Sequence, residues 1–208
     1  GNSATCVQVI TVFDNTVPTI NCPANVTVQC AFQVPLPLFA AQGGTASDNC
    51  GGTPAVTHLG DVTVNQTCIN RYTLNRTYRA IDECGNSATC VQVITVFDNT
   101  APIISCPPNI TVQCASQVVA VNVNDVTVSD NCGGIPVVTH VSDVTVNQTC
   151  INRYTLNRTY RATDACGNSA TCVQVITVFD NTVPTISCPQ NVTVQCANLV
   201  PPVNIAGV

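Results

Sequence analysis

Hydrophobic residues, mostly Val, Ile and Ala, alternate along much of the chain with Thr, Asn and Gln. This alternation predicts half-buried β-strands, and no stretch has the period of an amphipathic helix. Turn signals separate the strands, which we expect in the first repeating unit at residues 19–22, 25–30, 55–58, 61–66, 70–81 and 87–97, with a variable piece before residue 48. Seven short strands in about 84 residues are typical of an immunoglobulin-like β-sandwich.

One string, GNSATCVQVITVFDNT, occurs three times without change, at residues 1–16, 85–100 and 167–182. Equivalent cysteines at positions 22, 106 and 188 give spacings of 84 and 82 residues. Internal periodicity of this length predicts tandem repeats. We therefore expect two complete repeats, at residues 14–97 and 98–179, and a chain that is a window cut from a longer repeating polypeptide. Residues 1–13 would be the last strand of a preceding repeat, and residues 180–208 the opening strands of a following one.

The last strand of the repeat departs from simple alternation. Val91, Val93 and Phe97 lie on one face, whereas Ile94 and Val96 lie on the other. Strands that are covered on both sides have this composition. The strand would therefore be packed by a neighbouring unit or chain, or bent by a bulge that switches its faces. If it is an exposed edge, it would invite the addition of another strand.

Composition sets the class of protein. The chain has 15 cysteines in 208 residues and contains no Lys, Met or Trp, which indicates a disulfide framework in an extracellular, oxidising setting. Its net charge of −5 argues against nucleic acid as a partner. No apolar run approaches the roughly 18 residues that a membrane span requires, so we expect no membrane insertion.

Two motifs in each repeat resemble a known family. The first is Asp14-x-x-x-Pro18-x-Ile20-x-Cys22-Pro23, and the second is Ala80-x-Asp82-x-x-Gly85-Asn86-x-x-x-Cys90. Both are similar to the hyalin repeat (HYR). The resemblance implies tandem immunoglobulin-like repeats in extracellular proteins concerned with adhesion and matrix building. The usual repeat matches only the first and last cysteines, whereas each unit here has six.

In a sandwich of this type the first and last strands lie side by side, so Cys22 would bond Cys90. Two look-alike loops would share one end of the repeat, and the remaining two cysteines would lie at the other end. The expected pairs are Cys22–Cys90, Cys30–Cys68, Cys50–Cys84, Cys106–Cys172, Cys114–Cys150 and Cys132–Cys166. Neighbouring repeats or other chains would supply partners for Cys6, Cys188 and Cys196. Zinc is the alternative, but its sites favour close C-x₂-C pairs, which are missing from this sequence.

Seven Asn-x-Thr sequons recur in the repeats, and we expect those of the full repeats to lie on outward faces of strands. They start at Asn25, Asn65, Asn75, Asn109, Asn147, Asn157 and Asn191. On the same strands, the residues that face the core would include Val26, Val28, Val62 and Val64. Covalent glycans are one interpretation, and a plain polar strand face is the other.

Acidic residues gather where repeats join. Carboxylate and amide oxygens are ligands for Ca²⁺, although they would provide fewer than the six to eight oxygens that the ion prefers. The candidate ligands are Asp14, Asp48, Asp82, Asp98, Asn99, Asp130 and Asp164. The alternative is that Asp and Asn simply form turns.

The sequence has no catalytic constellation. His58 and His140 are the only histidines, at equivalent places in the two repeats, with no accompanying base or nucleophile motif. We expect no enzyme activity and no required cofactor. The first hypothesis is a structural protein that assembles with copies of itself into an extracellular fibre or stalk. The second is an adhesin that presents a ligand site on the variable loops at residues 31–47 and 115–129.

Overall fold

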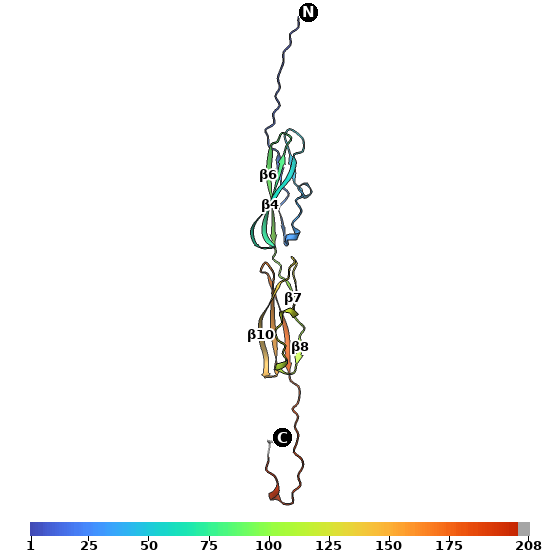
Figure 1. Ribbon diagram of the computed structural model, residues 1–208, viewed down its shortest axis with the longest axis vertical. Helices are drawn as coiled ribbons and strands as arrows, with labels where there is room; N and C mark the ends of the chain where they lie inside the picture. Colours follow the sequence, from blue (N-terminus) through green and yellow to red (C-terminus); the bar gives the residue numbers. More distant parts are fainter. Residues whose placement is uncertain (204–208) are drawn as a thin grey trace. The chain divides into compact units, whose positions relative to one another are not determined.

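The computed structural model describes residues 1–203, which form an all-β protein with short 3₁₀ turns (Figure 1). The strands of the first repeat are β1 Thr19–Asn21, β2 Val26–Val28, β3 Thr45–Ser47, β4 Ala55–Cys68, β5 Arg71–Ile81 and β6 Ser87–Phe97. Those of the second repeat are β7 Ile103–Ser105, β8 Ile110–Val112, β9 Thr127–Ser129, β10 Val137–Cys150, β11 Arg153–Thr163 and β12 Ser169–Phe179. The 3₁₀ turns are η1 Ala31–Gln33, η2 Ala40–Gln42, η3 Ala115–Gln117, η4 Val123–Asp125 and η5 Ala197–Leu199.

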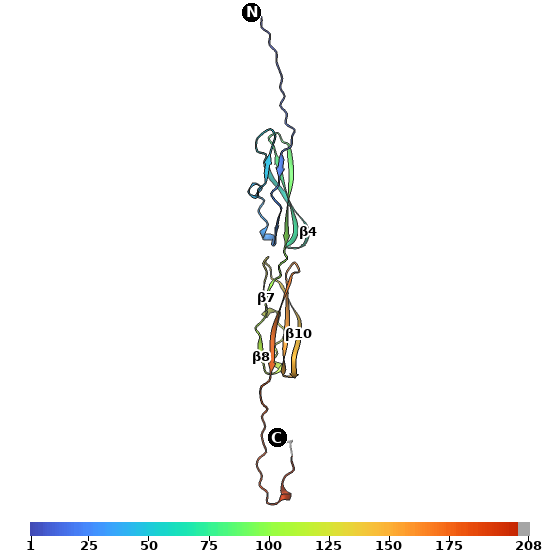
Figure 2. The same cartoon turned by 180° about the vertical axis from the view of Figure 1, so that it is seen from behind.

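Each repeat is a sandwich of a four-stranded and a two-stranded sheet, whose faces are seen from opposite sides in Figures 1 and 2. The larger sheets have the strand orders β2-β6-β5-β4 and β8-β12-β11-β10, and the smaller ones pair β1 with β3 and β7 with β9. In the larger sheets β2 and β8 run parallel to the last strand of their repeat. The predicted tandem, disulfide-rich, immunoglobulin-like β-sandwich is confirmed.

Two strand predictions were wrong in detail. The segments predicted at 55–58 and 61–66 form one strand, β4, because a register shift between His58 and Gly60 absorbs the extra residue without ending the pairing with β5. Val62 follows this shift and is 59% exposed, so its predicted inward position was also wrong. A period-two pattern cannot locate a bulge, because one inserted residue exchanges the two faces.

The last strand, β6, lies in the interior of its sheet, between β5 and β2, and keeps an unbroken register with β5. Ile94 and Val96 are completely buried, whereas Val91 is 51% exposed on the opposite face. The strand is therefore neither an edge nor bent by a bulge against β5. Its outward apolar residues belong to the outer face of the four-stranded sheet.

The core of each repeat is small and is built around one tyrosine. In the first repeat Tyr78, Ala80 and Ile94 have no exposed surface, and Tyr160, Ala162 and Ile176 repeat this arrangement in the second. The disulfides Cys22–Cys90 and Cys106–Cys172 connect the end of the smaller sheet to the last strand of the larger one. A thin core depends strongly on such cross-links.

The chain divides into two compact units that do not coincide with the repeats. The first contains Gly1–Pro108, Val121–Asp143 and Arg158–Gln174, and the second contains Asn109–Ala120, Val144–Asn157 and the chain from Val175. Residues 1–18 and 180–196 form no strand, although they copy sequences that are strands elsewhere. The last part of the predicted 180–208 segment, residues 204–208, lies outside the described residues. Among residues 1–203 no helix has the length and hydrophobicity needed to cross a membrane.

Candidate functional site

Two disulfides connect cysteines of the first repeat to cysteines of the second, and all four residues belong to the first compact unit. Cys30 bonds Cys132, with their Cα atoms 5.0 Å apart. Cys68 bonds Cys166, with a Cα–Cα distance of 5.2 Å. Both distances are ordinary for a disulfide. We call these four cysteines, with the connector at residues 98–100, the junction.

The structure corrects part of the expected pairing. It contains the Cys22–Cys90 and Cys106–Cys172 bridges, but the expected pairs Cys30–Cys68 and Cys132–Cys166 are replaced by bonds across the junction. The expected pairs Cys50–Cys84 and Cys114–Cys150 are not formed either, and these four cysteines are free. The sequence argument treated each repeat as closed. At the junction, however, the end of one repeat that carries Cys30 and Cys68 meets loops of the next that carry Cys132 and Cys166.

A second set of contacts at the junction is polar. The Gln29 side-chain oxygen accepts hydrogen bonds from the Thr100 hydroxyl at 2.7 Å and from the Asn131 amide nitrogen at 3.0 Å. Thr100 lies in the connector and Asn131 lies next to Cys132. One glutamine therefore holds the connector and the following loop against the first repeat.

Asp98, the first residue of the connector, is almost completely buried, with 1% of its surface exposed. Its backbone N–H donates to the carbonyl of Asn70 at 2.9 Å. Its carbonyl accepts hydrogen bonds from the Arg71 guanidinium at 2.6 Å and the Asn168 side chain at 3.2 Å. Each backbone polar group of Asp98 thus has a fixed partner, which removes much of the freedom of a linker.

The calcium candidates are brought together only in part. The ligand atoms of Asp98, Asp130 and Cys132 lie within 4.8 Å of one another, as do those of Asp14, Asp48 and Cys50. Each group has only two carboxylates, and the Cys132 sulfur is already bonded to Cys30. This donor set is poor for Ca²⁺, which prefers six to eight oxygens.

The other two aspartates hold turns. Asp164 accepts from the backbone N–H of Cys166 at 2.8 Å and that of Asn168 at 2.9 Å, and Asp82 accepts from the N–H of Asn86 at 2.8 Å. These contacts are the ones expected of turn-forming aspartates. Calcium binding stays a prediction. A melting temperature that is the same with Ca²⁺ and with a chelator would contradict it.

Among residues 1–203, seven cysteines are free: Cys6, Cys50, Cys84, Cys114, Cys150, Cys188 and Cys196. Partial loss of solvent contact, and then a hydrogen bond to Asp14, raise the pKa of the Cys50 thiol. Desolvation and nearby carboxylates likewise raise the pKa of the Cys84 thiol. A raised thiol pKa leaves less thiolate at neutral pH, so disulfide exchange at these two positions should become faster as the pH rises.

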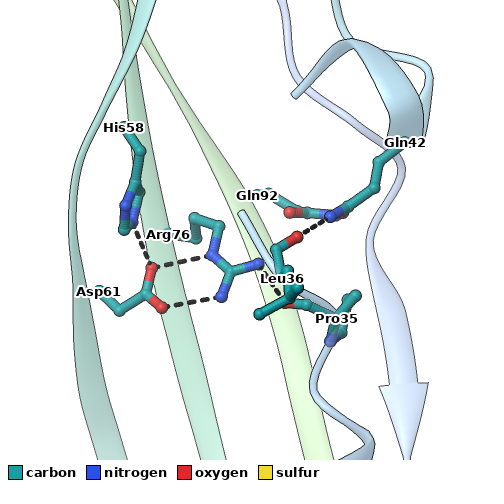
Figure 3. A network of polar contacts seen from close by, with 7 residues as sticks. All are labelled: Pro35, Leu36, Gln42, His58, Asp61, Arg76 and Gln92. Carbon is teal, nitrogen blue, oxygen red and sulfur yellow. Dashed lines mark hydrogen bonds and ion pairs between the residues drawn. The ribbon is translucent and has the colours of Figure 1, made fainter. Parts of the chain in front are cut away.

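Each larger sheet contains a buried arginine, Arg76 in the first repeat (Figure 3) and Arg158 in the second. Arg76 is 3% exposed; its Nε and one terminal nitrogen donate to the two carboxylate oxygens of Asp61 at 2.9 and 2.8 Å. Its other terminal nitrogen donates to the carbonyl of Pro35 at 2.7 Å, which fixes the variable loop to β5. The His58 ring contacts the same Asp61 carboxylate at 2.8 Å. Arg76 and Asp61 thus form a bidentate ion pair, and its role is to stabilise the fold.

We expect Asp61→Asn to destabilise the first repeat by about 1–3 kcal/mol, because it leaves the buried Arg76 guanidinium without its anion. Bonds from Arg76 lower the pKa of Asp61. The stability that Asp61 contributes is therefore present above the unfolded-state pKa of about 3.9 and is lost as the pH falls through the lower folded-state pKa. Urea melts between pH 2 and 7 would show this acid dependence in the wild type and a weaker dependence in the variant. Equal profiles would contradict the prediction, and Asp143→Asn is the matched change in the second repeat.

The sequon asparagines differ in exposure. Asn25, Asn65, Asn109, Asn147 and Asn191 are exposed, whereas Asn75 and Asn157 are half-buried. Asn65 and Asn147 also have positive φ angles of 55° and 54°, at equivalent positions in β4 and β10. The side-chain oxygen (Oδ1) of Asn25 accepts a hydrogen bond from the backbone N–H of Val93 at 2.8 Å, so this side chain also aligns β2 with β6.

Sequence reasoning did not single out Gln29, Asn70 or Arg71. Their only signal is that each recurs at the same place in the next repeat, as Gln113, Asn152 and Arg153. The repeats share many residues, so recurrence does not separate a junction residue from any other.

A chain of two disulfide-braced β-sandwiches joined without a flexible linker is a tandem extracellular repeat protein. A family model described as an HYR-like domain with 4 cysteines matches residues 18–96 and 102–178. The two matches cover more than half of the chain, so this protein belongs to the HYR-like family. Domains of this family are a non-enzymatic, structural or adhesive type. Each repeat here has six cysteines, two more than the family description states.

Proposed function

We propose that this protein is a structural element of an extracellular stalk or fibre, in which consecutive HYR-like repeats, at residues 14–97 and 98–179, are fastened to each other by covalent bonds. The observation that carries the proposal is the pair of bridges at the junction, Cys30–Cys132 and Cys68–Cys166. A module that only displays a binding site has no need to be bonded twice to its neighbour. A load-bearing stalk does, because each bridge resists both unfolding and bending.

The connector supports the same proposal. It contains no Gly or Ser spacer, and the buried Asp98 is held by Asn70, Arg71 and Asn168. Flexible linkers have the opposite composition and leave the backbone in water. Two bridges at different points of one junction also prevent rotation about the connector, which a single bridge would allow.

Spin labels in the two repeats test the proposal. Pulsed electron–electron double resonance measures the distance between the two labels. It should give one narrow distance distribution in the oxidised protein, and a broad one in the variant with Cys30→Ser and Cys68→Ser. A distribution that is equally broad in both proteins would reject a stiff junction. Electron microscopy of the purified parent polypeptide would then test assembly with copies of itself, because the proposal requires filaments and not isolated flexible rods.

The adhesin is a second candidate, favoured by the variable loop of the first repeat. Phe32 and Leu36 in this loop are 72% and 71% exposed, and Phe39 packs on Tyr78 beside a hollow of about 500 Å³. A hollow lined by Phe39, together with exposed apolar side chains elsewhere in the same loop, suits a ligand. Exchanging residues 31–47 for residues 115–129 should abolish surface binding by an adhesin. Binding that survives the exchange would rule this site out.

Glycans would complement either function. Asn75 and Thr77 lie opposite Val93 and Val91 on the outer face of the larger sheet, so a sugar on Asn75 would cover half-exposed apolar residues. In a glycosylating host we expect higher occupancy at Asn65 and Asn147, which are exposed, than at the half-buried Asn75 and Asn157. Enzymatic glycan release followed by peptide mass spectrometry measures occupancy at each site. Empty sites at Asn65 and Asn147 would contradict this prediction.

A further inference from the structure

Four of the free thiols form two pairs that repeat, position for position, the two halves of the bonded junction. Cys114 and Cys150 are the second-repeat equivalents of Cys30 and Cys68. Cys50 and Cys84 are the first-repeat equivalents of Cys132 and Cys166. The chain therefore contains one complete junction and two unpaired halves of opposite kind.

The half that carries Cys114 has the hydrogen bonds of the complete junction. The Gln113 side chain accepts from the Thr182 hydroxyl at 2.7 Å, as Gln29 does from Thr100. The N–H of Ala115 donates to the Asn152 side chain at 2.9 Å, as that of Ala31 does to Asn70 at 2.8 Å. The local geometry is thus set before any partner is bound.

This half differs from the complete junction in exposure. Cys30 is 1% exposed, whereas Cys114 is half-buried, and Cys150 is exposed where Cys68 is half-buried. Asp98 is 1% exposed, whereas its equivalent, Asp180, is half-buried. The surface that the second repeat covers in the complete junction is therefore open around Cys114 and Cys150.

The half that carries Cys50 is equally well formed. The backbone N–H of Cys50 donates to the Asp48 carboxylate at 2.9 Å, and the N–H of Cys132 donates to the Asp130 carboxylate at the same distance. The Asn86 side chain donates to the Asp14 carbonyl at 3.3 Å, as Asn168 does to Asp98 at 3.2 Å. Cys50 and Cys84 are exposed thiols on a surface whose copy in the second repeat is bonded.

We propose that the two unpaired halves are docking sites for further HYR-like repeats, joined through the same Asp-Asn-Thr connector and bonded by one fixed rule. We call a cysteine of another repeat Cys50-type when it occupies the position that Cys50 has in the first repeat, and name the other types in the same way. Cys114 bonds the Cys50-type cysteine of a following repeat, and Cys150 bonds its Cys84-type cysteine. Cys50 and Cys84 bond the Cys30-type and Cys68-type cysteines of a preceding repeat. This inference rests on the proposed function. It adds the surface on which a neighbouring repeat docks, the kind of repeat that docks there, and the cysteine pairs that form.

The rule also assigns the other three free cysteines. Residues 1–13 copy β6, so Cys6 corresponds to Cys90 and takes a Cys22-type partner in a preceding repeat. Residues 184–196 resemble residues 18–30, so Cys188 takes a Cys90-type partner in a following repeat. Cys196 is a Cys30-type residue and bonds across the next junction. All seven free cysteines of the described chain then have a defined partner.

Each new bridge forms by thiol–disulfide exchange. Two cysteine thiols together lose two protons and two electrons, and one molecule of oxidised glutathione is reduced to two of glutathione. Only the thiolate attacks, so a mildly alkaline buffer should speed the step at Cys50 and Cys84.

The test extends the chain by one repeat. A copy of residues 101–179 replaces the chain after Thr182, the protein is refolded in glutathione buffer, and its disulfides are mapped by mass spectrometry after digestion without reduction. The bridges of Cys114 and Cys150 to the added repeat are expected, and two fewer thiols among residues 1–182 should react with iodoacetamide. In the control, the Cys132 and Cys166 equivalents of the added repeat are serine, and Cys114 and Cys150 should both be alkylated.

The outcomes separate this inference from the proposed function. A Cys114–Cys150 bridge, or alkylation of both thiols in the extended chain, overturns the docking rule while Cys30–Cys132 and Cys68–Cys166 still support the stalk. If Cys30–Cys132 and Cys68–Cys166 are missing as well, both the docking rule and the proposed function fail. Because the added repeat copies one already in the chain, a melting transition equal to that of the original repeats would show that it has folded.

Discussion

Cutting the polypeptide between the two repeats is expected to leave both halves in one covalent species. A site for a sequence-specific protease placed between Thr100 and Ala101 interrupts the connector, but Cys30–Cys132 and Cys68–Cys166 would still join the pieces. Electrophoresis after cleavage should show the full mass without reductant and two fragments with it. The pairing within each repeat that the sequence suggested would instead release two fragments under both conditions.

Matched variants sharpen this experiment. Cys30→Ser alone and Cys68→Ser alone should each keep the halves together through the remaining bridge, and the double variant should release them. If a single variant releases them, only one bridge forms. The bridges join residues 102 and 98 positions apart, and loops of about 100 residues correspond to nearly 5 kcal/mol in the chain-entropy model. The double variant should therefore also unfold at a lower denaturant concentration.

The second large effect is expected inside a repeat. Replacing both Cys22 and Cys90 by alanine removes a bridge between residues 68 positions apart, which would cost about 4 kcal/mol. A domain of this size has a total stability of about 4–12 kcal/mol. We therefore expect the melting temperature of the first repeat to fall by about 15–30 °C.

Calorimetry measures this change, and the second repeat offers the matched control. Replacing Cys106 and Cys172 by alanine removes the equivalent bridge and should shift the transition of the second repeat by a similar amount. A shift of only a few degrees would show that the small core, and not the bridge, stabilises the repeat. Loss of both transitions in either variant would show that the two repeats unfold together.

Some of the site could be predicted because it depends on local pattern. Alternation along β5 puts Tyr72, Leu74, Tyr78 and Ala80 on one face. Leu74, Tyr78 and Ala80 are buried, and Tyr72 is half-buried. Arg76 shares that face, and its burial could not be foreseen because it depends on Asp61, a residue of another strand. Pairing of strands that are distant in sequence decides which charges can be compensated.

The sequence by itself determined the repeat, the all-β class, the oxidising setting and the Cys22–Cys90 type of bridge. The first three follow from composition, from a period of two within strands and from a period of 82–84 residues along the chain. The Cys22–Cys90 pair follows from the fold class, because the first and last strands of such a sandwich lie side by side. Only the tertiary structure decided that Cys30 and Cys68 bond the next repeat. Spacing cannot distinguish a partner in the same repeat from one in the next, because each cysteine type occurs in both, and only the fold brings the end of one repeat against the loops of its neighbour.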